Sequence, residues 1–319
     1  MKNTRTIAAL CLGLLLSHAA LSAEKAPGRA ASTATSGTAT ATACDRECLR
    51  GLVTQVLHAF VEHDVSTLPV AASLRVTEDG VEKPLDKVGL VRSVTKLRGY
   101  RQDILDERAG QAVAGVMVEE AGAPIILVLR VKADGDRLGE LELVTTRSRA
   151  DGMIFAIDRY SGAPGKVMSL APKPAQLATR EKAIEIAMHY PRGLSNAETF
   201  AAIGTPFSKD AFRIENGALM AGPGCTFAPG CADIAQQSLA IFKRLGRVTV
   251  RDVLVDERMG IVVMRLSWNQ RGPGSDRLTA FEYFKVVDGQ IHAVEAWIRL
   301  FPPELDLGGW PIRATVTQP

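Results

Sequence analysis

The sequence contains one pattern twice, and this repeat constrains the fold more than any other feature. Four motifs recur in the same order: Glu78–Gly80 with Glu215–Gly217, Asp106–Gly110 with Asp256–Gly260, Asp134–Gly135 with Asp288–Gly289, and Glu142 with Glu295. The residue numbers differ by 137 in the first pair and by 150, 154 and 153 in the others. The second copy therefore carries an insertion, which we place at residues 222–231. A repeat of this length predicts two copies of one folding unit.

Each copy predicts helices first and strands afterwards. Apolar spacing in the first copy predicts helices over 45–62 and 88–97, then strands near 101–105, 111–119, 124–132 and 138–145. The second copy predicts a helix over 180–190 that stops at Pro191, short helices from Ser195 and within 234–245, and strands near 248–255, 261–269, 279–287 and 291–300. Helices followed by antiparallel strands predict an α+β fold and not a βαβ fold.

The same patterns predict how the chain divides into units. We expect a first unit at 44–150, a linker at 151–178 where Gly, Pro and Lys accumulate, a second unit at 179–302 and a C-terminal extension at 303–319. The repeated Asp-Glu-Arg motifs at 106–108 and 256–258 are each followed within two residues by Gly, which is typical of hairpin turns.

The N-terminus has the pattern of an export signal. Two bases precede an apolar run at 7–16 and a small-residue end at 19–23, which predicts a signal peptide over 1–23 and a periplasmic or secreted protein without a stable membrane anchor after processing. Residues 24–43 are rich in Ala, Thr and Ser and are expected to form a disordered linker.

Charge and cysteine content narrow the function further. The chain has 38 Lys and Arg residues, of which Lys2 and Arg5 lie in the predicted signal, so residues 24–319 carry 36 bases against 35 acids. This balance, without a basic run, argues against a nucleic-acid partner. Beyond the signal lie four cysteines: Cys44, Cys48, Cys225 and Cys231. They are expected to form disulfides and not a metal site, and of the three pairings that four cysteines allow, proximity favours 44 with 48 and 225 with 231.

Several motifs resemble those of a known protein family. They are CDRECL at 44–49, FVEHD at 60–64, VTEDG at 76–80, RIENG at 213–217, VDERMG at 255–260, FKVVDGQI at 284–291 and GGW at 308–310. Together they are similar to an uncharacterised family of exported fungal and bacterial proteins that carry two SnoaL-like, or nuclear-transport-factor-two-like, units. The resemblance implies two tandem cones, each a curved antiparallel sheet wrapped by helices, with a pocket in one or both.

In that superfamily the cone often carries acid/base chemistry without metal or cofactor, while other members only bind ligands or partners. A pocket in a curved sheet is lined by alternate residues of its strands, and in the second copy these strands contain several polar side chains. We select Glu282, Glu295 and His292 as candidate catalytic residues, and Arg265, Trp297, Tyr283 and Asn269 as candidate substrate-binding residues. Burial among Ala280 and Phe284 would raise the pKa of Glu282. The alternative is that these residues face solvent on the outer side of the sheet.

The sequence thus leaves two functional hypotheses. The first is an exported, cofactor-independent lyase, isomerase or hydrolase that acts on a small organic molecule in the second unit. The second is a ligand-binding or assembly module, with a homodimer through the sheets as one arrangement. The two differ in whether two titratable groups lie within reach of one small-molecule volume.

Overall fold

Both halves of the chain begin with a long helix that is fixed at its first turn by a capping side chain. The computed structural model describes residues 44–157, 163–268, 275–305, 310 and 314–315. Helix α1 (Arg46–Glu62) starts after Asp45, which accepts a hydrogen bond from the Cys48 amide at 2.9 Å. Helix α5 (Arg180–Asn196) starts after Thr179, which accepts one from the Lys182 amide at 3.3 Å.

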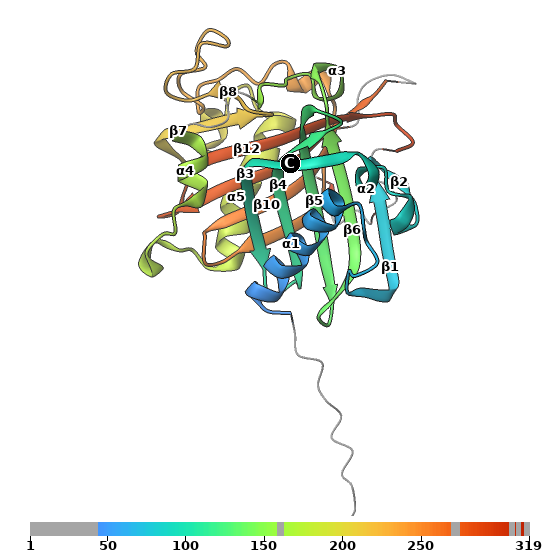
Figure 1. Cartoon of the computed structure of the whole chain (residues 1–319). Coiled ribbons are helices and arrows are strands. Elements are labelled where there is room, and N and C mark those ends of the chain that lie inside the picture. The colour runs from blue at the N-terminus through green and yellow to red at the C-terminus, as the bar shows by residue number, and fades with distance from the viewer. Residues whose placement is uncertain (1–43, 158–162, 269–274, 306–309, 311–313, 316–319) are drawn as a thin grey trace, which may run out of the picture. The chain divides into compact units, whose positions relative to one another are not determined.

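The first half continues into a six-stranded sheet (Figure 1). Its elements are β1 (Val70–Glu78), β2 (Val81–Glu82), the 3-10 turn Leu85–Lys87, α2 (Leu90–Ser93), β3 (Val94–Asp106), β4 (Gln111–Glu120), β5 (Ala123–Asp134) and β6 (Arg137–Thr146). The strand order is β2-β1-β6-β5-β4-β3. Two short helices, α3 (Arg149–Gly152) and α4 (Ala163–Ser169), and the 3-10 turn Pro174–Gln176 lead to the second half.

The second half has the same strand order. Its elements are the 3-10 turn Ala201–Ile203, β7 (Phe207–Glu215), β8 (Ala218–Ala221), the 3-10 turn Phe242–Arg244, β9 (Val248–Asp256), β10 (Ile261–Trp268), β11 (Arg277–Val287), β12 (Gln290–Phe301) and β13 (Ala314–Thr315). The order is β13-β9-β10-β11-β12-β7-β8, so β7 to β12 repeat β1 to β6 and β13 is added at the edge. Two mixed sheets with few helices make this an α+β protein.

The expectation of purely antiparallel sheets is wrong at one place in each half. Strand β1 pairs with β6 in parallel, and β7 pairs with β12 in parallel. Each of these pairs joins the first and last strands of a half, which lie far apart in sequence. Local periodicity reports which residues form a strand, but not which distant strand becomes its neighbour.

Three predicted helix boundaries also differ from the structure. Residues 94–97 begin β3 and do not extend the helix before it, and 234–245 contains only the 3-10 turn at Phe242–Arg244. Helix α5 continues through Pro191 to Asn196, so no separate helix starts at Ser195 as predicted. Pro191 removes one backbone hydrogen bond from the helix, yet Tyr190, Pro191 and Leu194 are all buried against the second sheet, and this packing keeps the helix continuous.

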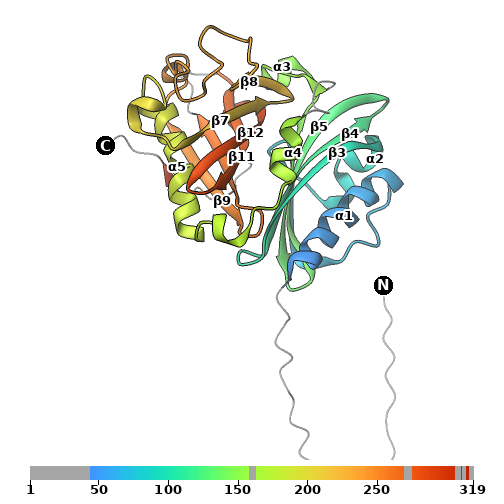
Figure 2. The same cartoon turned by 90° about the vertical axis from the view of Figure 1, so that its left-hand side faces the viewer.

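Three apolar clusters divide the described part of the chain into layers. One cluster lies between α1 and the first sheet, and another between α5 and the second sheet (Figure 2). The third contains the opposite sheet faces, with residues such as Val113, Ile126, Val263 and Phe281. The two sheets therefore pack against each other within one chain, and a homodimer through sheet faces stays a prediction. No helix in the described part of the chain is long and apolar enough to cross a membrane.

The repeated Asp-Glu-Arg motifs are hairpin turns, as predicted, and they also join the two halves. Asp256 accepts two hydrogen bonds from Arg46, both at 2.8 Å, and one from the Leu105 amide at 3.2 Å. In the matching contact, Asp106 accepts bonds from Arg180 at 2.9 and 2.6 Å and from the Val255 amide at 2.9 Å. Each half thus binds the start of the other half's helix.

This reciprocal contact predicts a specific loss of stability. Asp256→Asn removes the charge that pairs with Arg46 inside the protein, and we expect the free energy of unfolding to fall by about 2–3 kcal/mol. The control is Arg108→Ala, because the Arg108–Glu257 pair also joins the halves but Arg108 is 66% exposed; its loss should cost less than about 1 kcal/mol. Urea unfolding measures both values, and equal losses would contradict the assigned role of Asp256.

Both disulfides have the pairing that proximity favours. Cys44 is bonded to Cys48, and Cys225 to Cys231. The second bond lies in the connection between β8 and β9, residues 222–247, which is longer than the matching connection 83–93 between β2 and β3. We call residues 222–247 the insertion segment.

Candidate functional site

The second half contains a cavity of about 300 Å³. It is bounded by α5, by the second sheet, by the end of α3 and by the insertion segment. Most of its wall is apolar: Met153, Ile154, Met220, Phe227, Ile241, Phe242, Leu245, Leu278 and Ile298. The polar side chains that line it are Tyr190, Arg213, Glu215, Gln237, Ser238, Arg244, Trp268 and Glu282. A mostly apolar cavity with a few polar groups is typical of a small-molecule site.

The polar groups inside the cavity include a buried ion pair. The Nε of Arg213 lies 2.7 Å from Oε1 of Glu215, two residues further along β7. Arg213 also donates a hydrogen bond to the Tyr190 hydroxyl on α5 at 3.3 Å. Burial alone would lower the pKa of Arg213, but the nearby Tyr190 and Glu215 outweigh it and raise this pKa above its ordinary value. Arg213 therefore keeps its positive charge.

Glu282 on β11 lies in the same cavity and is in a different electrostatic state. Its side chain is buried, and burial, reinforced by the charge of Glu215 and opposed by Arg213, raises its pKa to about 8. At neutral pH this carboxyl therefore carries a proton. Its Oε2 has no hydrogen-bond partner among the described residues, and the same holds for Trp268 Nε1 and Gln237 Oε1 in the cavity wall.

The first half provides a comparison within the same chain. When the sheets are matched through their strand pairing, Val76 on β1 occupies the position of Arg213 on β7. In the same way, Leu129 on β5 occupies the position of Glu282 on β11. Counting from the first residue of each long helix, Val56 matches Tyr190. Val56, Val76 and Leu129 are all buried in the apolar cluster under α1. The fold therefore packs with apolar residues at the positions of Tyr190, Arg213 and Glu282. Burying polar side chains there costs free energy, and packing alone gives no reason for their presence in the second half.

The structure brings only one predicted catalytic residue into this cavity. Glu282 lines it, whereas Glu295 pairs through its backbone with Tyr283 and lies on the opposite sheet face, between the two sheets. His292 lies near the start of β12, where a ring nitrogen contacts the Val287 carbonyl at 3.2 Å. The predicted group of Glu282, Glu295 and His292 is thus not one site. Glu282 and Glu295 are both buried and so do not face solvent, whereas His292 is partly exposed.

The predicted substrate-binding residues are also separated from the cavity. Tyr283 and Trp297 belong to the apolar cluster between the sheets. Arg265 is buried at the same interface, with its Nε 3.6 Å from Oε1 of Glu142 in the first half. Asn269 lies outside the described residues. Sequence reasoning missed Tyr190, Arg213, Glu215 and Trp268 as site residues, because Arg213 and Glu215 enter it only as members of the repeated and family motifs, and Tyr190 and Trp268 carry no local signal of a site.

Glu142 and Glu295 occupy matching positions in the two halves but have opposite electrostatic environments. Burial would raise the pKa of Glu142, but three arginines, Arg251, Arg130 and Arg265, outweigh it and lower this pKa to about 2. Glu295 receives one hydrogen bond, from the Tyr100 hydroxyl at 2.6 Å, and burial raises its pKa to about 8.

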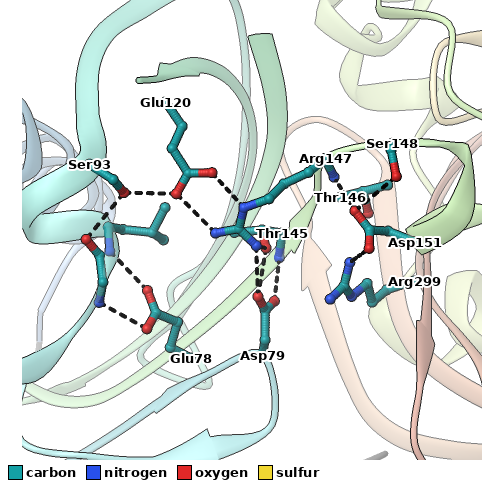
Figure 3. Close-up of polar contacts among 12 residues, drawn as sticks. Glu78, Asp79, Ser93, Glu120, Thr145, Thr146, Arg147, Ser148, Asp151 and Arg299 are labelled. Carbon is teal, nitrogen blue, oxygen red and sulfur yellow. Dashed lines mark hydrogen bonds and ion pairs between the residues drawn. The ribbon is translucent and has the colours of Figure 1, made fainter. Parts of the chain in front are cut away.

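A polar cluster holds one wall of the cavity in place (Figure 3). Arg147, which follows β6, donates a hydrogen bond to Glu120 at 3.0 Å and pairs with Asp79 at 3.1 Å. Asp151, in the same connection, pairs with Arg299 of β12 at 2.7 Å. These contacts fix the segment that leads to Met153 and Ile154, so we assign this cluster a structural role.

Stability should depend on pH through Glu282 and Glu295. Their ordinary pKa of 4.5 is raised to about 8 in the folded state, so between these values the unfolded state holds fewer protons and stability falls as pH rises. We expect unfolding midpoints in urea to fall between pH 5 and pH 8, and Glu282→Gln with Glu295→Gln to remove most of this dependence. An unchanged pH dependence in the double variant would contradict the burial of these carboxyls.

Comparisons with known proteins place no function on this chain. A family model described as a domain of unknown function, DUF8021, matches residues 176–298, which include the cavity strands. No curated protein matches the chain. Among solved structures, a de novo designed protein with a curved β-sheet is similar, with 18% identity, 38% of this chain and 88% of that chain covered, and a TM-score of 0.31. An M. tuberculosis LEH-like epoxide hydrolase, which has a nuclear-transport-factor-two-like fold, is similar with 16% identity, 37% and 83% coverage, and a TM-score of 0.27.

Proposed function

We propose that the chain is an exported enzyme that performs acid/base chemistry on a small organic molecule in the second-half cavity, as a lyase, isomerase or hydrolase. One observation supports this most: three buried polar atoms, Glu282 Oε2, Trp268 Nε1 and Gln237 Oε1, line one apolar cavity without a hydrogen-bond partner among the described residues. An unsatisfied buried polar atom costs about 1–3 kcal/mol. A bound molecule that supplies the missing hydrogen bonds recovers this energy.

The proposed roles follow from the charge state of each group. Glu282 carries a proton at neutral pH and gives it to an acceptor oxygen of the substrate. Glu215, the carboxylate of the ion pair, accepts a proton from a substrate carbon in a lyase or isomerase reaction, or from water in a hydrolase reaction. One proton enters the substrate and one leaves, so the step balances without a cofactor. Arg213 stabilises negative charge that develops beside it.

We further propose that each half is a SnoaL-like cone. The support is internal: each half has a long helix, then a short hairpin, then four strands, and the last of these four pairs in parallel with the first strand of the hairpin. Export is proposed from the N-terminal pattern, which lies outside the described residues, together with the two disulfides. The mass of the mature chain tests this, since cleavage after Ala23 should remove residues 1–23.

Turnover of a panel of uncharged small organic compounds tests the enzymatic proposal. We would incubate the protein with cyclohexenone, a β-hydroxyketone and δ-decalactone, which cover isomerase, lyase and hydrolase chemistry, and analyse the products by gas chromatography; 2-octanone, which none of these reactions converts, serves as a binding probe. We expect conversion of at least one class above a control without protein. Binding of these compounds without conversion would instead favour the ligand-binding hypothesis, and neither binding nor conversion would contradict both.

A further inference from the structure

Exposed apolar side chains gather at the mouth of the cavity. The described residues include six large apolar side chains that are exposed to solvent: Val81, Met153, Leu170, Ile203, Phe227 and Ile241. Three of these six, Met153, Phe227 and Ile241, also line the cavity. Phe227 and Ile241 are 63% and 62% exposed and belong to the insertion segment, which lies beside α3 in both views (Figures 1 and 2). Apolar groups gathered at one place on a surface indicate a binding surface.

A disulfide and hydrogen bonds fix the conformation of the insertion segment. Phe227 lies inside the ring that the Cys225–Cys231 disulfide closes. The amide of Gly222 donates to the Cys231 carbonyl at 2.7 Å, and Gln237 Nε2 donates to the Met220 carbonyl at 3.0 Å. The Gln237 bond ties the insertion segment to β8, and the disulfide and the Gly222 bond close the loop that contains Phe227.

The charge of the insertion segment identifies the partner that it fits. Residues 222–247 contain three bases, Lys243, Arg244 and Arg247, and a single acid, Asp233. Arg244 and Arg247 are exposed, and Arg244 also lines the cavity. Apolar side chains combined with basic ones are the composition that binds anionic lipid surfaces, in which the apolar groups enter the acyl region and the bases meet the headgroups.

We propose that the cavity mouth docks on a bilayer with anionic headgroups, and that the cavity takes a lipophilic ligand directly from the lipid phase. The uptake of a ligand by the cavity rests on the proposed function, whereas the docking on the bilayer does not. Because the residues that contact lipid are the same residues that frame the cavity, a molecule dissolved in the bilayer reaches Glu282 and Trp268 without crossing water. The substrate class is then a neutral, poorly water-soluble molecule with an acceptor oxygen.

Co-sedimentation with vesicles tests the docking. We would compare vesicles of phosphatidylcholine alone with an equal mixture of phosphatidylcholine and phosphatidylglycerol. Phe227→Ser with Ile241→Ser should weaken partitioning about 100-fold, since each apolar side chain is worth at least about tenfold. Arg244→Ala with Arg247→Ala should weaken binding to the anionic vesicles about fivefold per arginine.

Two controls separate this inference from the proposed enzyme. Leu170→Ser removes an equally exposed apolar side chain away from the cavity, and Glu282→Gln removes the proposed acid; both should bind vesicles like the unchanged protein. Vesicle binding that is absent, or that Leu170→Ser reduces as strongly as Phe227→Ser with Ile241→Ser, would overturn the docking inference even if the panel is converted. Normal vesicle binding without turnover would overturn the enzymatic proposal and leave the docking inference standing.

Discussion

Glu142→Gln is expected to lower the free energy of unfolding by about 3–5 kcal/mol, while Glu295→Gln, at the matching position of the other half, is expected to leave it unchanged or raise it at pH 8. Glu142 is the shared partner of Arg130, Arg251 and Arg265. Removing its charge leaves three buried guanidinium groups with less compensation, and breaking a buried pair in this way is strongly destabilising.

Among the residues that the structure describes, none places a cation against the Glu295 carboxyl. Its pKa of about 8 means that it is largely protonated in the folded protein at neutral pH, and a glutamine amide can replace that carboxyl and still accept the Tyr100 hydrogen bond. Urea unfolding of both variants at pH 6 and pH 8 measures the contrast. Equal destabilisation by the two substitutions would show that the two interfaces are electrostatically alike, which contradicts the environments described above.

Glu282→Gln is expected to reduce kcat/KM by about 10²–10⁴ on whichever compound of the panel is converted, because a glutamine amide cannot donate a proton as a general acid. Tyr190→Phe, which removes the hydroxyl that Arg213 contacts, should cause a smaller loss. Glu282→Leu would give this position the residue type of Leu129 in the first half, and we expect a folded protein without activity.

The matched control is Glu295→Gln. This variant removes a carboxyl with the same raised pKa, from the same sheet but from its opposite face. Its kcat/KM should stay within about twofold of the unchanged protein. Activity that survives in Glu282→Gln and disappears in Glu295→Gln would move the active site to the interface between the sheets.

Much of the scaffold could be predicted from the sequence because its signals are local. The repeated Asp-Glu-Arg motifs predict hairpin turns, and the structure has these turns at corresponding positions of the two halves. The short spacing within each cysteine pair predicts both disulfides. The burial of Glu282 could be predicted because its neighbours two residues away, Ala280 and Phe284, are apolar, and all three residues are buried in the structure.

The rest of the site depended on contacts that no local pattern contains. Arg213 and Glu215 meet Glu282 through β7, which reaches the sheet by parallel pairing with β12. The sequence alone does not show that Glu295 and Glu282 lie apart. In the β11–β12 register Glu295 is paired with Tyr283, the neighbour of Glu282, so the two carboxyls lie on opposite faces of the sheet. A shift of one residue in register reverses every side chain of a strand. The sequence does contain one signal of the site: a polar residue in the second copy where the first copy has an apolar one. This is the case for Arg213 against Val76 and for Glu282 against Leu129.

We propose the second-half cavity as the ligand site, and the three tryptophans of the chain provide a direct test of this assignment. Trp268 lines the cavity, Trp297 lies between the sheets, and Trp310 donates a hydrogen bond to Thr77 in the first half. Titration of 2-octanone, followed through the three indole N–H signals by nuclear magnetic resonance, should shift the Trp268 signal and leave the other two in place. Shifts of the Trp297 or Trp310 signal with an unmoved Trp268 signal would show that the ligand binds outside this cavity.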